Sequence, residues 1–139
     1  MAKTQSSSAA RVRYIVTDIA KSVAFYRDLL GFNVIMDRAP NFALLSNGSL
    51  ELYINPPGSG GAGQTLSTGE VPQPGGWNRI QLLVDDLEEQ IKTLKAKGAT
   101  FKADLVKGNA GMQILLVDPS GNLVELFQPY SIGDRAQSR

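Results

Sequence analysis

The sequence contains an internal repeat, and this repeat constrains the fold more than any other feature. In each half a β-rich segment precedes an aspartate, an apolar stripe at helical spacing, a glycine and further extended segments. Asp18 in the first half corresponds to Asp86 in the second, and Arg11 corresponds to Arg79 at the same interval. Such self-similarity indicates two copies of one supersecondary unit. We therefore predict an α+β chain built of two tandem βαβββ modules.

The first copy begins with a strand and a capped helix. The carboxylate of Asp18 can accept from the free amides of the first helical turn, and Gly31 stands where a helix should end. Asn47-Gly48 between two extended segments predicts a hairpin with a type I′ turn. The expected strands of this copy are residues 11–17, 32–37, 41–46 and 49–55.

The second copy repeats this order. Asp86 and Glu89 form a capping-box pattern at the start of the helix, and Gly98 ends it. The expected strands of this copy are residues 78–84, 99–106, 112–117 and 123–128.

The repeat also sets the domain organisation, which we predict to be one structural domain overall. The segment between the modules is rich in Gly and Pro, and it is either a crossing linker or a flap that contacts a substrate. The expected parts are a tail at 1–10, the first module at 11–55, the linker at 56–76, the second module at 77–130 and a tail at 131–139.

Two missing residue types restrict the chemistry. The 139-residue chain has no cysteine and no histidine. This composition excludes disulfides, thiolate nucleophiles, Ser-His machinery and His- or Cys-ligated metals. Any acid–base chemistry would fall to a carboxylate, Lys, Tyr or Arg.

Charge and hydropathy bear on partners and location. The net charge of +1 gives no field that would attract nucleic acid or an anionic membrane, so we expect neither as a partner. The first ten residues lack the apolar core of a signal peptide, and no apolar stretch is long enough to span a bilayer. We therefore expect a cytoplasmic protein.

Alternation along the strands predicts two different faces. One face of each strand is apolar and should meet the helix of its module. The other face mixes charged side chains with aromatic ones, including Tyr53 and Phe127. Solvated outer positions would explain the charges alone, whereas the aromatic residues favour a partly polar cleft. We therefore expect the two modules to form a curved mixed sheet around a cleft.

The sequence resembles the vicinal oxygen chelate superfamily, which includes glyoxalase I, bleomycin-resistance proteins and extradiol dioxygenases. The resemblance rests on RVRYIVTDIAKSVAFYRDLLGF, GWNRIQLLVDDLEEQIKTLKAKGA and DPSGNLVELFQP. It implies a glyoxalase/bleomycin-resistance-like fold, with a ligand cleft completed within one chain or in a homodimer. We expect a homodimer.

The resemblance also implies where a metal would be held in related enzymes. Two of the four ligand positions fall on Arg11 and Arg79, and the other two fall on Glu51 and Glu125. Arginine has no lone pair to donate and stays protonated, so we expect no metal and no other cofactor. We hypothesise that these four residues form a salt-bridged cluster, which is either structural or presents an Arg to a ligand.

The expected function is therefore that of a metal-free protein that binds a small molecule in the cleft between the modules. One alternative is a glyoxalase-like lyase or isomerase, or less plausibly a dioxygenase, with Glu125 as base. Another is a non-catalytic module that binds a metabolite or a partner. Trp77 taken alone is typical of a packing residue, whereas its place beside Gly75-Gly76 and near Arg79 favours a ligand contact. The expected ligand-binding residues are Arg11, Arg13, Glu51, Tyr53, Trp77, Arg79, Gln81 and Phe127, with the three aromatic rings stacking on the ligand and Arg13 and Gln81 as polar anchors.

Overall fold

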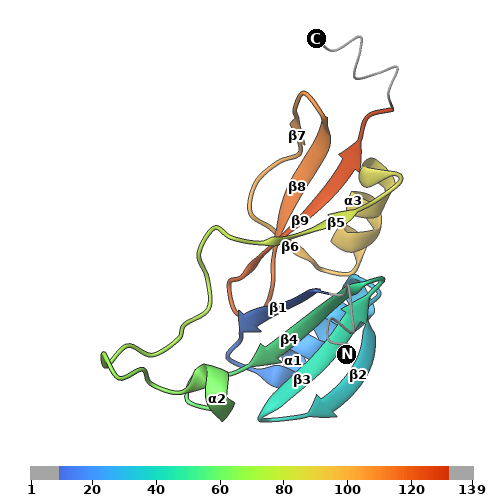
Figure 1. Ribbon diagram of the computed structural model, residues 1–139. Coiled ribbons are helices and arrows are strands. Elements are labelled where there is room, and N and C mark those ends of the chain that lie inside the picture. The colour runs from blue at the N-terminus through green and yellow to red at the C-terminus, as the bar shows by residue number, and fades with distance from the viewer. Residues whose placement is uncertain (1–9, 132–139) are drawn as a thin grey trace, which may run out of the picture. The chain divides into compact units, whose positions relative to one another are not determined.

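The computed structural model describes residues 10–131 and divides the chain into two compact units, Met1–Pro74 and Gly75–Arg139 (Figure 1). Each unit has its own sheet and core, so each is described by itself. Among the described residues, no helix is long and apolar enough to cross a membrane.

The first unit is a four-stranded mixed sheet with one helix against it. The sheet has the order β1-β4-β3-β2, in which β1 and β4 are parallel and the other pairs are antiparallel. A short helix in the Gly/Pro-rich segment follows the last strand, and the sequence did not predict it. The elements are β1 (Ala10–Ile15), α1 (Ile19–Ala24), the π-helical turn η1 (Phe25–Leu29), β2 (Asn33–Arg38), β3 (Phe42–Asn47), β4 (Leu50–Asn55) and α2 (Gly60–Gly63).

The predicted first helix has the expected ends. The Asp18 carboxylate accepts a 2.9 Å hydrogen bond from the Lys21 amide and thereby caps α1. Gly31 follows the helix with φ = +74°, a conformation that favours glycine. Between these ends, however, the α-helix stops at Ala24 and continues as the wider π-helical turn η1, a change that helical spacing alone does not reveal.

The hairpin between β3 and β4 differs from the prediction. Asn47 pairs with Leu50, so the two loop residues are Gly48 and Ser49 and not Asn47 and Gly48. Gly48 has φ = +59°, and no described residue other than glycine has a positive φ. A type I′ turn needs positive φ at both loop residues, so the type I′ prediction is wrong.

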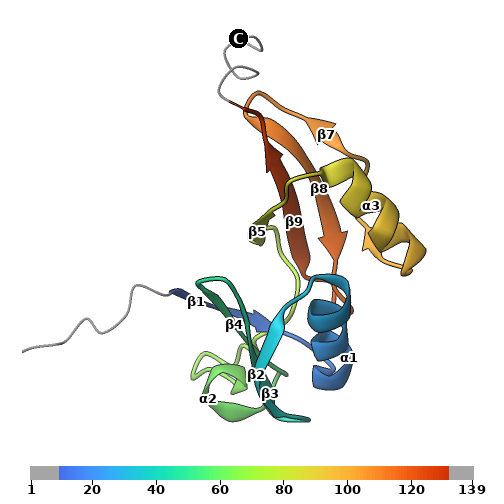
Figure 2. The same ribbon diagram turned by 90° about the vertical axis from the view of Figure 1, so that its right-hand side faces the viewer.

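The first sheet has one face for the core and one for the site. Leu45, Leu52 and Ile54 are fully buried together with Val16 and Tyr26. Figure 2 shows α1 and α2 on opposite sides of this sheet. The helix α1 covers the apolar core side, and α2 contacts β4 and lies on the other side.

The second unit repeats the plan with a five-stranded sheet. Its order is β5-β9-β8-β6, with β7 also paired to β8, and β5 and β9 are the parallel pair. The single strand expected at residues 99–106 is wrong, because β6 and β7 are separate two-residue strands on the same side of β8. The elements are β5 (Ile80–Leu83), α3 (Leu87–Ala96), β6 (Thr100–Phe101), β7 (Val106–Lys107), β8 (Gly111–Val117) and β9 (Leu123–Pro129).

Both ends of α3 agree with the sequence pattern. The Asp86 carboxylate accepts a 3.1 Å hydrogen bond from the Glu89 amide. Gly98 has φ = +84°, and the amides of Gly98 and Ala99 donate to the carbonyls of Lys95 and Leu94. These two bonds form a Schellman motif.

The α+β class with mixed sheets is confirmed, since each module has the predicted helix and a sheet with one parallel pair. The expected tails lie outside the described residues, except that Ala10 opens β1 and Ser131 follows β9. The unit boundary at Pro74 and Gly75 places most of the predicted linker with the first unit.

Candidate functional site

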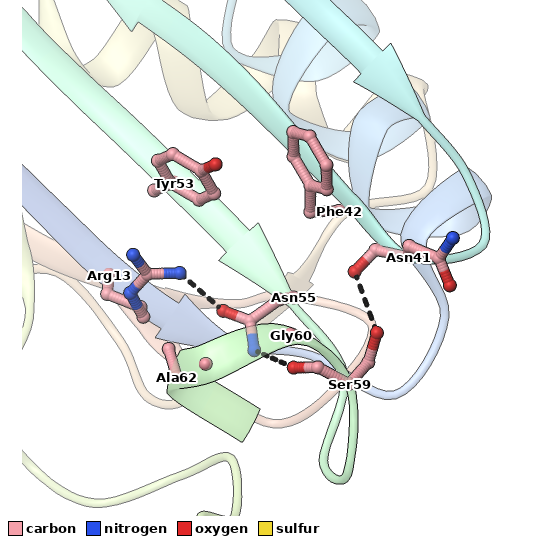
Figure 3. A pocket seen from close by; sticks show the side chains of 9 residues that line it. Arg13, Asn41, Phe42, Tyr53, Asn55, Ser59, Gly60 and Ala62 are labelled. Atoms are coloured by element: carbon pink, nitrogen blue, oxygen red, sulfur yellow. Dashed lines mark hydrogen bonds between the residues drawn. The ribbon is translucent and has the colours of Figure 1, made fainter. Parts of the chain in front are cut away.

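The first unit contains a pocket of about 510 Å³ on the face of the sheet opposite α1 (Figure 3). The sheet forms one side of the pocket and the turn around α2 forms another. Polar and aromatic side chains line it together with backbone from two glycines. The lining residues are Arg13, Asn41, Phe42, Tyr53, Asn55, Ser59, Gly60, Gly61 and Ala62.

One charged and two aromatic side chains form a row along the sheet surface that lines the pocket. Arg13 on β1, Tyr53 on β4 and Phe42 on β3 stand on three adjacent strands. The guanidinium carbon of Arg13 lies 4.3 Å from the centroid of the Tyr53 ring. The Tyr53 and Phe42 rings are stacked, with centroids 5.5 Å apart and an angle of 24° between their planes. The row therefore offers a positive end and an aromatic end to the same pocket.

The buried side chain of Asn55 is hydrogen-bonded both to Arg13 and to the backbone next to α2. Its side chain is buried, with 2 % of the residue exposed. Its Oδ1 accepts a 2.8 Å hydrogen bond from Nη1 of Arg13. Its Nδ2 donates to the carbonyl oxygens of Pro56 and Ser59, both at 3.3 Å. One buried amide thus orients both the cation and the loop that line the pocket.

The α2 turn packs closely on the end of β4. A Cβ atom at Gly63 would overlap the carbonyl oxygen of Pro56 and approach the Nδ2 of Asn55 to 2.9 Å. At Gly61, by contrast, a Cβ atom would meet nothing within 4 Å. The residues 56–63, named here the α2 segment, are therefore held at Gly63 and open at Gly61. This part of the predicted linker lines the pocket, and whether it contacts a substrate stays a prediction.

The first module also contains the pair of Arg11 and Glu51. These residues face each other across β1 and β4, and Arg11 Nε donates to Glu51 Oε1 at 2.7 Å. Both side chains are solvent-accessible, with 59 % of Arg11 and 29 % of Glu51 exposed. The Arg11 guanidinium also lies 5.8 Å from the Tyr53 ring, although Arg11 does not line the pocket.

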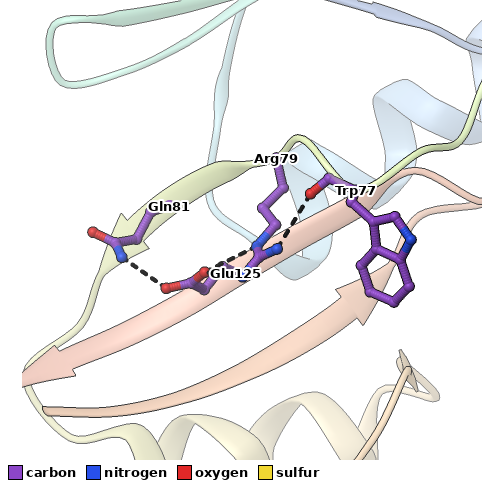
Figure 4. A network of polar contacts seen from close by, with 4 residues as sticks. All are labelled: Trp77, Arg79, Gln81 and Glu125. Atoms are coloured by element: carbon purple, nitrogen blue, oxygen red, sulfur yellow. Dashed lines mark hydrogen bonds and ion pairs between the residues drawn. The ribbon is translucent and has the colours of Figure 1, made fainter. Parts of the chain in front are cut away.

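The second module holds a more buried network around Glu125 (Figure 4). Glu125 is 5 % exposed. Its Oε1 accepts from Arg79, at 3.0 Å from Nε and 2.9 Å from Nη2, and its Oε2 accepts from Gln81 Nε2 at 2.7 Å. Arg79 Nη1 also donates to the Trp77 carbonyl oxygen at 3.2 Å. Both carboxylate oxygens are therefore engaged by donors.

The two glutamates do not occupy the same register position. Glu51 lies directly across from Arg11, whereas the residue across from Glu125 is Gln81, and Arg79 reaches Glu125 diagonally. The predicted Arg–Glu pairs thus exist within each module, but with different geometry. The joining of both pairs into one cluster stays a prediction, as does the cleft shared by the two modules.

The donor chemistry of these residues does not fit a metal. A divalent cation would need lone pairs, and the arginines provide only N–H donors. Those donors already occupy Glu51 Oε1 and Glu125 Oε1, and Gln81 uses its amide nitrogen on the remaining Glu125 oxygen. Within residues 10–131, no group of three His, Cys, Asp or Glu side chains could hold an ion.

The other predicted aromatic residues lie in the second unit. Trp77 is 67 % exposed, and its role as a packing residue or a ligand contact stays a prediction. Its ring lies 5.8 Å from the Lys102 ammonium. Phe127 lies across from Leu83 and against Gly111.

Of the predicted site residues, the structure therefore brings Arg13 and Tyr53 into one pocket and Arg79, Gln81 and Glu125 into one network. Sequence reasoning missed the residues that complete the pocket. Asn41 and Phe42 stood at the start of an expected strand, and Asn55 was a polar residue ending an apolar strand, so all three carried a weak signal. Ser59 to Ala62 carried none, because a Gly-rich segment does not reveal where its backbone packs.

A helix-covered mixed sheet that occurs twice in one chain, with charged and aromatic side chains opposite the helix, defines the class of tandem βαβββ proteins. The chain belongs to the Glyoxalase/Bleomycin resistance protein/Dioxygenase superfamily, whose family model matches residues 8–126. This confirms the resemblance seen in the sequence. No curated protein sequence matches the chain.

Solved structures with the same fold differ in what their names describe. A lactoylglutathione lyase from Agrobacterium tumefaciens is 19 % identical with a TM-score of 0.69, and the match covers 89 % of this chain and 96 % of that one. TnmS3, an antibiotic-binding protein from Streptomyces sp. CB03234, is 21 % identical with a TM-score of 0.68, covering 92 % and 100 %. A superfamily member from Sphaerobacter thermophilus DSM 20745 is 24 % identical with a TM-score of 0.70, covering 88 % and 97 %. At these identities the likeness concerns the fold, which hosts both catalysis and binding.

Proposed function

We propose that this protein binds a small organic molecule without a metal, and that the pocket of the first unit receives it. The observation that carries the proposal is the pocket itself, in which Arg13, Tyr53 and Phe42 converge with the α2 segment. A volume of about 510 Å³ falls within the range of small-molecule sites, which combine apolar walls with a few oriented polar groups. The structural likeness to an antibiotic-binding protein is compatible with this function.

The hydrogen bonds of the Glu125 carboxylate support ligand binding as the function, and not lyase or isomerase chemistry. A general base needs a carboxylate oxygen free to take a proton from its substrate. Both oxygens of Glu125 instead accept from Arg79 and Gln81, and proton transfer would have to break one of these contacts. The arginines at the opening positions of the two modules also provide no coordination for an enediolate-stabilising metal.

The first experiment measures metal content and ligand binding on the same purified chain. Mass spectrometry should find no stoichiometric Fe, Mn, Ni or Zn, and a thermal-shift screen of aromatic and aliphatic compounds should reveal stabilising ligands. The stabilisation should disappear in Gly61→Phe, which adds a ring at a residue that lines the pocket, where space is open and φ is not positive. A stoichiometric metal lost in Glu51→Gln or Glu125→Gln, or the absence of any stabilising compound, would contradict the proposal.

The second experiment tests turnover. The chain should leave the hemithioacetal of methylglyoxal and glutathione unchanged. Consumption of this substrate by the parent chain, abolished in Glu125→Gln, would instead identify a lyase that uses Glu125 as base.

We also propose a cytoplasmic homodimer. The edge strand β2 supports a protein contact, because Val34, Ile35 and Met36 are all exposed along it. Light scattering coupled to size exclusion should give the mass of two chains, and a monomer at micromolar concentration would contradict this assembly.

A further inference from the structure

The pocket contains a cation, Arg13, for which the described part of the chain provides no anionic partner. Three other arginines within residues 10–131 form ion pairs, namely Arg11 with Glu51, Arg27 with Asp28 and Arg79 with Glu125. Among the described residues, Arg13 has no carboxylate within ion-pair distance, and its one hydrogen-bond acceptor is the neutral amide oxygen of Asn55. Guanidinium has five N–H donors, so four of them remain without an acceptor in this part of the chain.

The surroundings of Arg13 keep this charge uncompensated. Within residues 10–131, no aspartate or glutamate lines the pocket. Glu51, which stands two residues before Tyr53 on β4, is neutralised by Arg11. An anion entering the pocket would therefore meet a positive charge for which no carboxylate among the described residues competes.

Arg13 is also held in place before any ligand arrives. The buried Oδ1 of Asn55 fixes one end of its guanidinium, and the Tyr53 ring lies beneath it at 4.3 Å. A planar guanidinium group fixed in this way presents paired N–H donors that match the two oxygens of a carboxylate. Because little side-chain entropy is left to lose, binding an acceptor here is favoured.

The uncharged part of the pocket, away from Arg13, suits a planar apolar group of a ligand. Tyr53 and Phe42 present nearly parallel rings, and Gly60 and Gly61 present backbone without side chains. Aromatic ligands stack on such rings, and side-chain-free backbone leaves room for a planar group. Figure 3 shows the aromatic residues and Arg13 around one opening.

We infer that the ligand of this pocket is a planar aromatic anion of the aryl carboxylate class, with its carboxylate on Arg13 and its ring system against Tyr53 and Phe42. This inference rests on the proposed function, since it names the ligand class of the same pocket.

The test uses three matched probes on the full chain, with titration calorimetry as the readout. 2-Naphthoate carries both features, 2-naphthamide has the same ring without the charge, and decahydro-2-naphthoate has the charge without the aromatic ring. We expect 2-naphthoate to bind, and each of the other two to bind about tenfold or more weakly, as expected when a charge-assisted hydrogen bond or ring stacking is lost. The affinity of 2-naphthoate should fall as NaCl is raised, whereas that of 2-naphthamide should not change.

Two variants test whether Arg13 is the residue that makes the protein prefer the acid over the amide. In Arg13→Gln the acid and the amide should bind equally, while in Arg27→Gln, which removes a cation outside the pocket, the preference for the acid should remain. The probe series and the salt dependence need no variant, so they decide the question even if Arg13→Gln folds poorly. Equal binding of acid and amide by the parent chain, or failure of 2-naphthoate while other compounds in the thermal-shift screen bind, would overturn the ligand class and leave the proposed function standing. Failure of every compound would overturn both.

Discussion

The buried side chain of Asn55 joins the guanidinium of Arg13 to the α2 segment. Its oxygen accepts from Arg13 at 2.8 Å, and its nitrogen donates to Pro56 and Ser59. Asn55, which ends β4, therefore positions both the charged side chain and the glycine-rich backbone that line the pocket. This arrangement makes the pocket sensitive to a residue that is itself almost inaccessible to solvent.

Replacing Asn55 by Ala should loosen the α2 segment. The change leaves the partly buried carbonyl oxygens of Pro56 and Ser59 with one donor fewer and removes the acceptor of Arg13, which should lower the free energy of unfolding by about 1–3 kcal/mol. Hydrogen exchange followed by mass spectrometry should show faster exchange in residues 56–63. Ser59→Ala is the control, because the Ser59 hydroxyl makes a single exposed 3.4 Å contact to the Asn41 carbonyl. Equal exchange in both variants would show that Asn55 does not hold the segment.

The two Arg–Glu pairs should differ in their contribution to stability. In Glu125→Gln the new amide nitrogen would face the donors of either Arg79 or Gln81 within a buried network, so we expect a loss of about 2–3 kcal/mol. Glu51→Gln alters an exposed pair and should cost less than about 1 kcal/mol. Urea unfolding followed by circular dichroism measures both changes. If Glu51→Gln is the more damaging variant, burial is not what distinguishes the pairs.

The sequence was sufficient to predict the repeating architecture, because the signals for it are local. Aspartate at the start of a helix and glycine at its end have conformational reasons that do not depend on distant residues, and Asp18, Asp86, Gly31 and Gly98 all occupy those positions. The same holds for alternation, which correctly placed Arg13 and Tyr53 on one face of the first sheet.

The remainder of the site depends on contacts that local patterns do not encode. The α2 segment lines the pocket because Asn55 binds its carbonyls and Gly63 allows close packing, and neither contact follows from a Gly/Pro-rich composition. The register of Glu125 against Gln81 was likewise not visible, since the matching of the two modules by sequence aligned Glu125 with Glu51. Register is fixed by pairing across the sheet and by the intervening turns.

Alanine substitutions at two glycines of α2, Gly61 and Gly63, should change the free energy of unfolding in opposite directions. Gly61→Ala adds a methyl group where nothing lies within 4 Å and where φ is not positive, so it should raise the free energy of unfolding by about 0.4–1 kcal/mol by restricting the unfolded chain. Gly63→Ala adds the same group against the Pro56 carbonyl and Asn55, so it should lower this free energy by about 1–3 kcal/mol. Urea unfolding should give changes of opposite sign, and matching signs would contradict the described packing of α2.

A last prediction concerns the close approach of β8 to β9. Gly111 pairs with Pro129, and a Cβ atom there would overlap the carbonyl oxygen of Gln128 and the ring of Phe127. Because the neighbouring backbone belongs to a paired strand and cannot move without breaking hydrogen bonds, Gly111→Ala should cost about 1–3 kcal/mol. Gly108→Ala is the matched control in the same hairpin, since its nearest neighbour would be 3.6 Å away, and it should change stability by less than about 0.5 kcal/mol. Urea unfolding compares the two variants, and hydrogen exchange of residues 123–129 locates the effect. Equal costs would mean that β8 can shift away from β9, and faster exchange confined to β9 in Gly111→Ala would show that this glycine sets the spacing of the two strands.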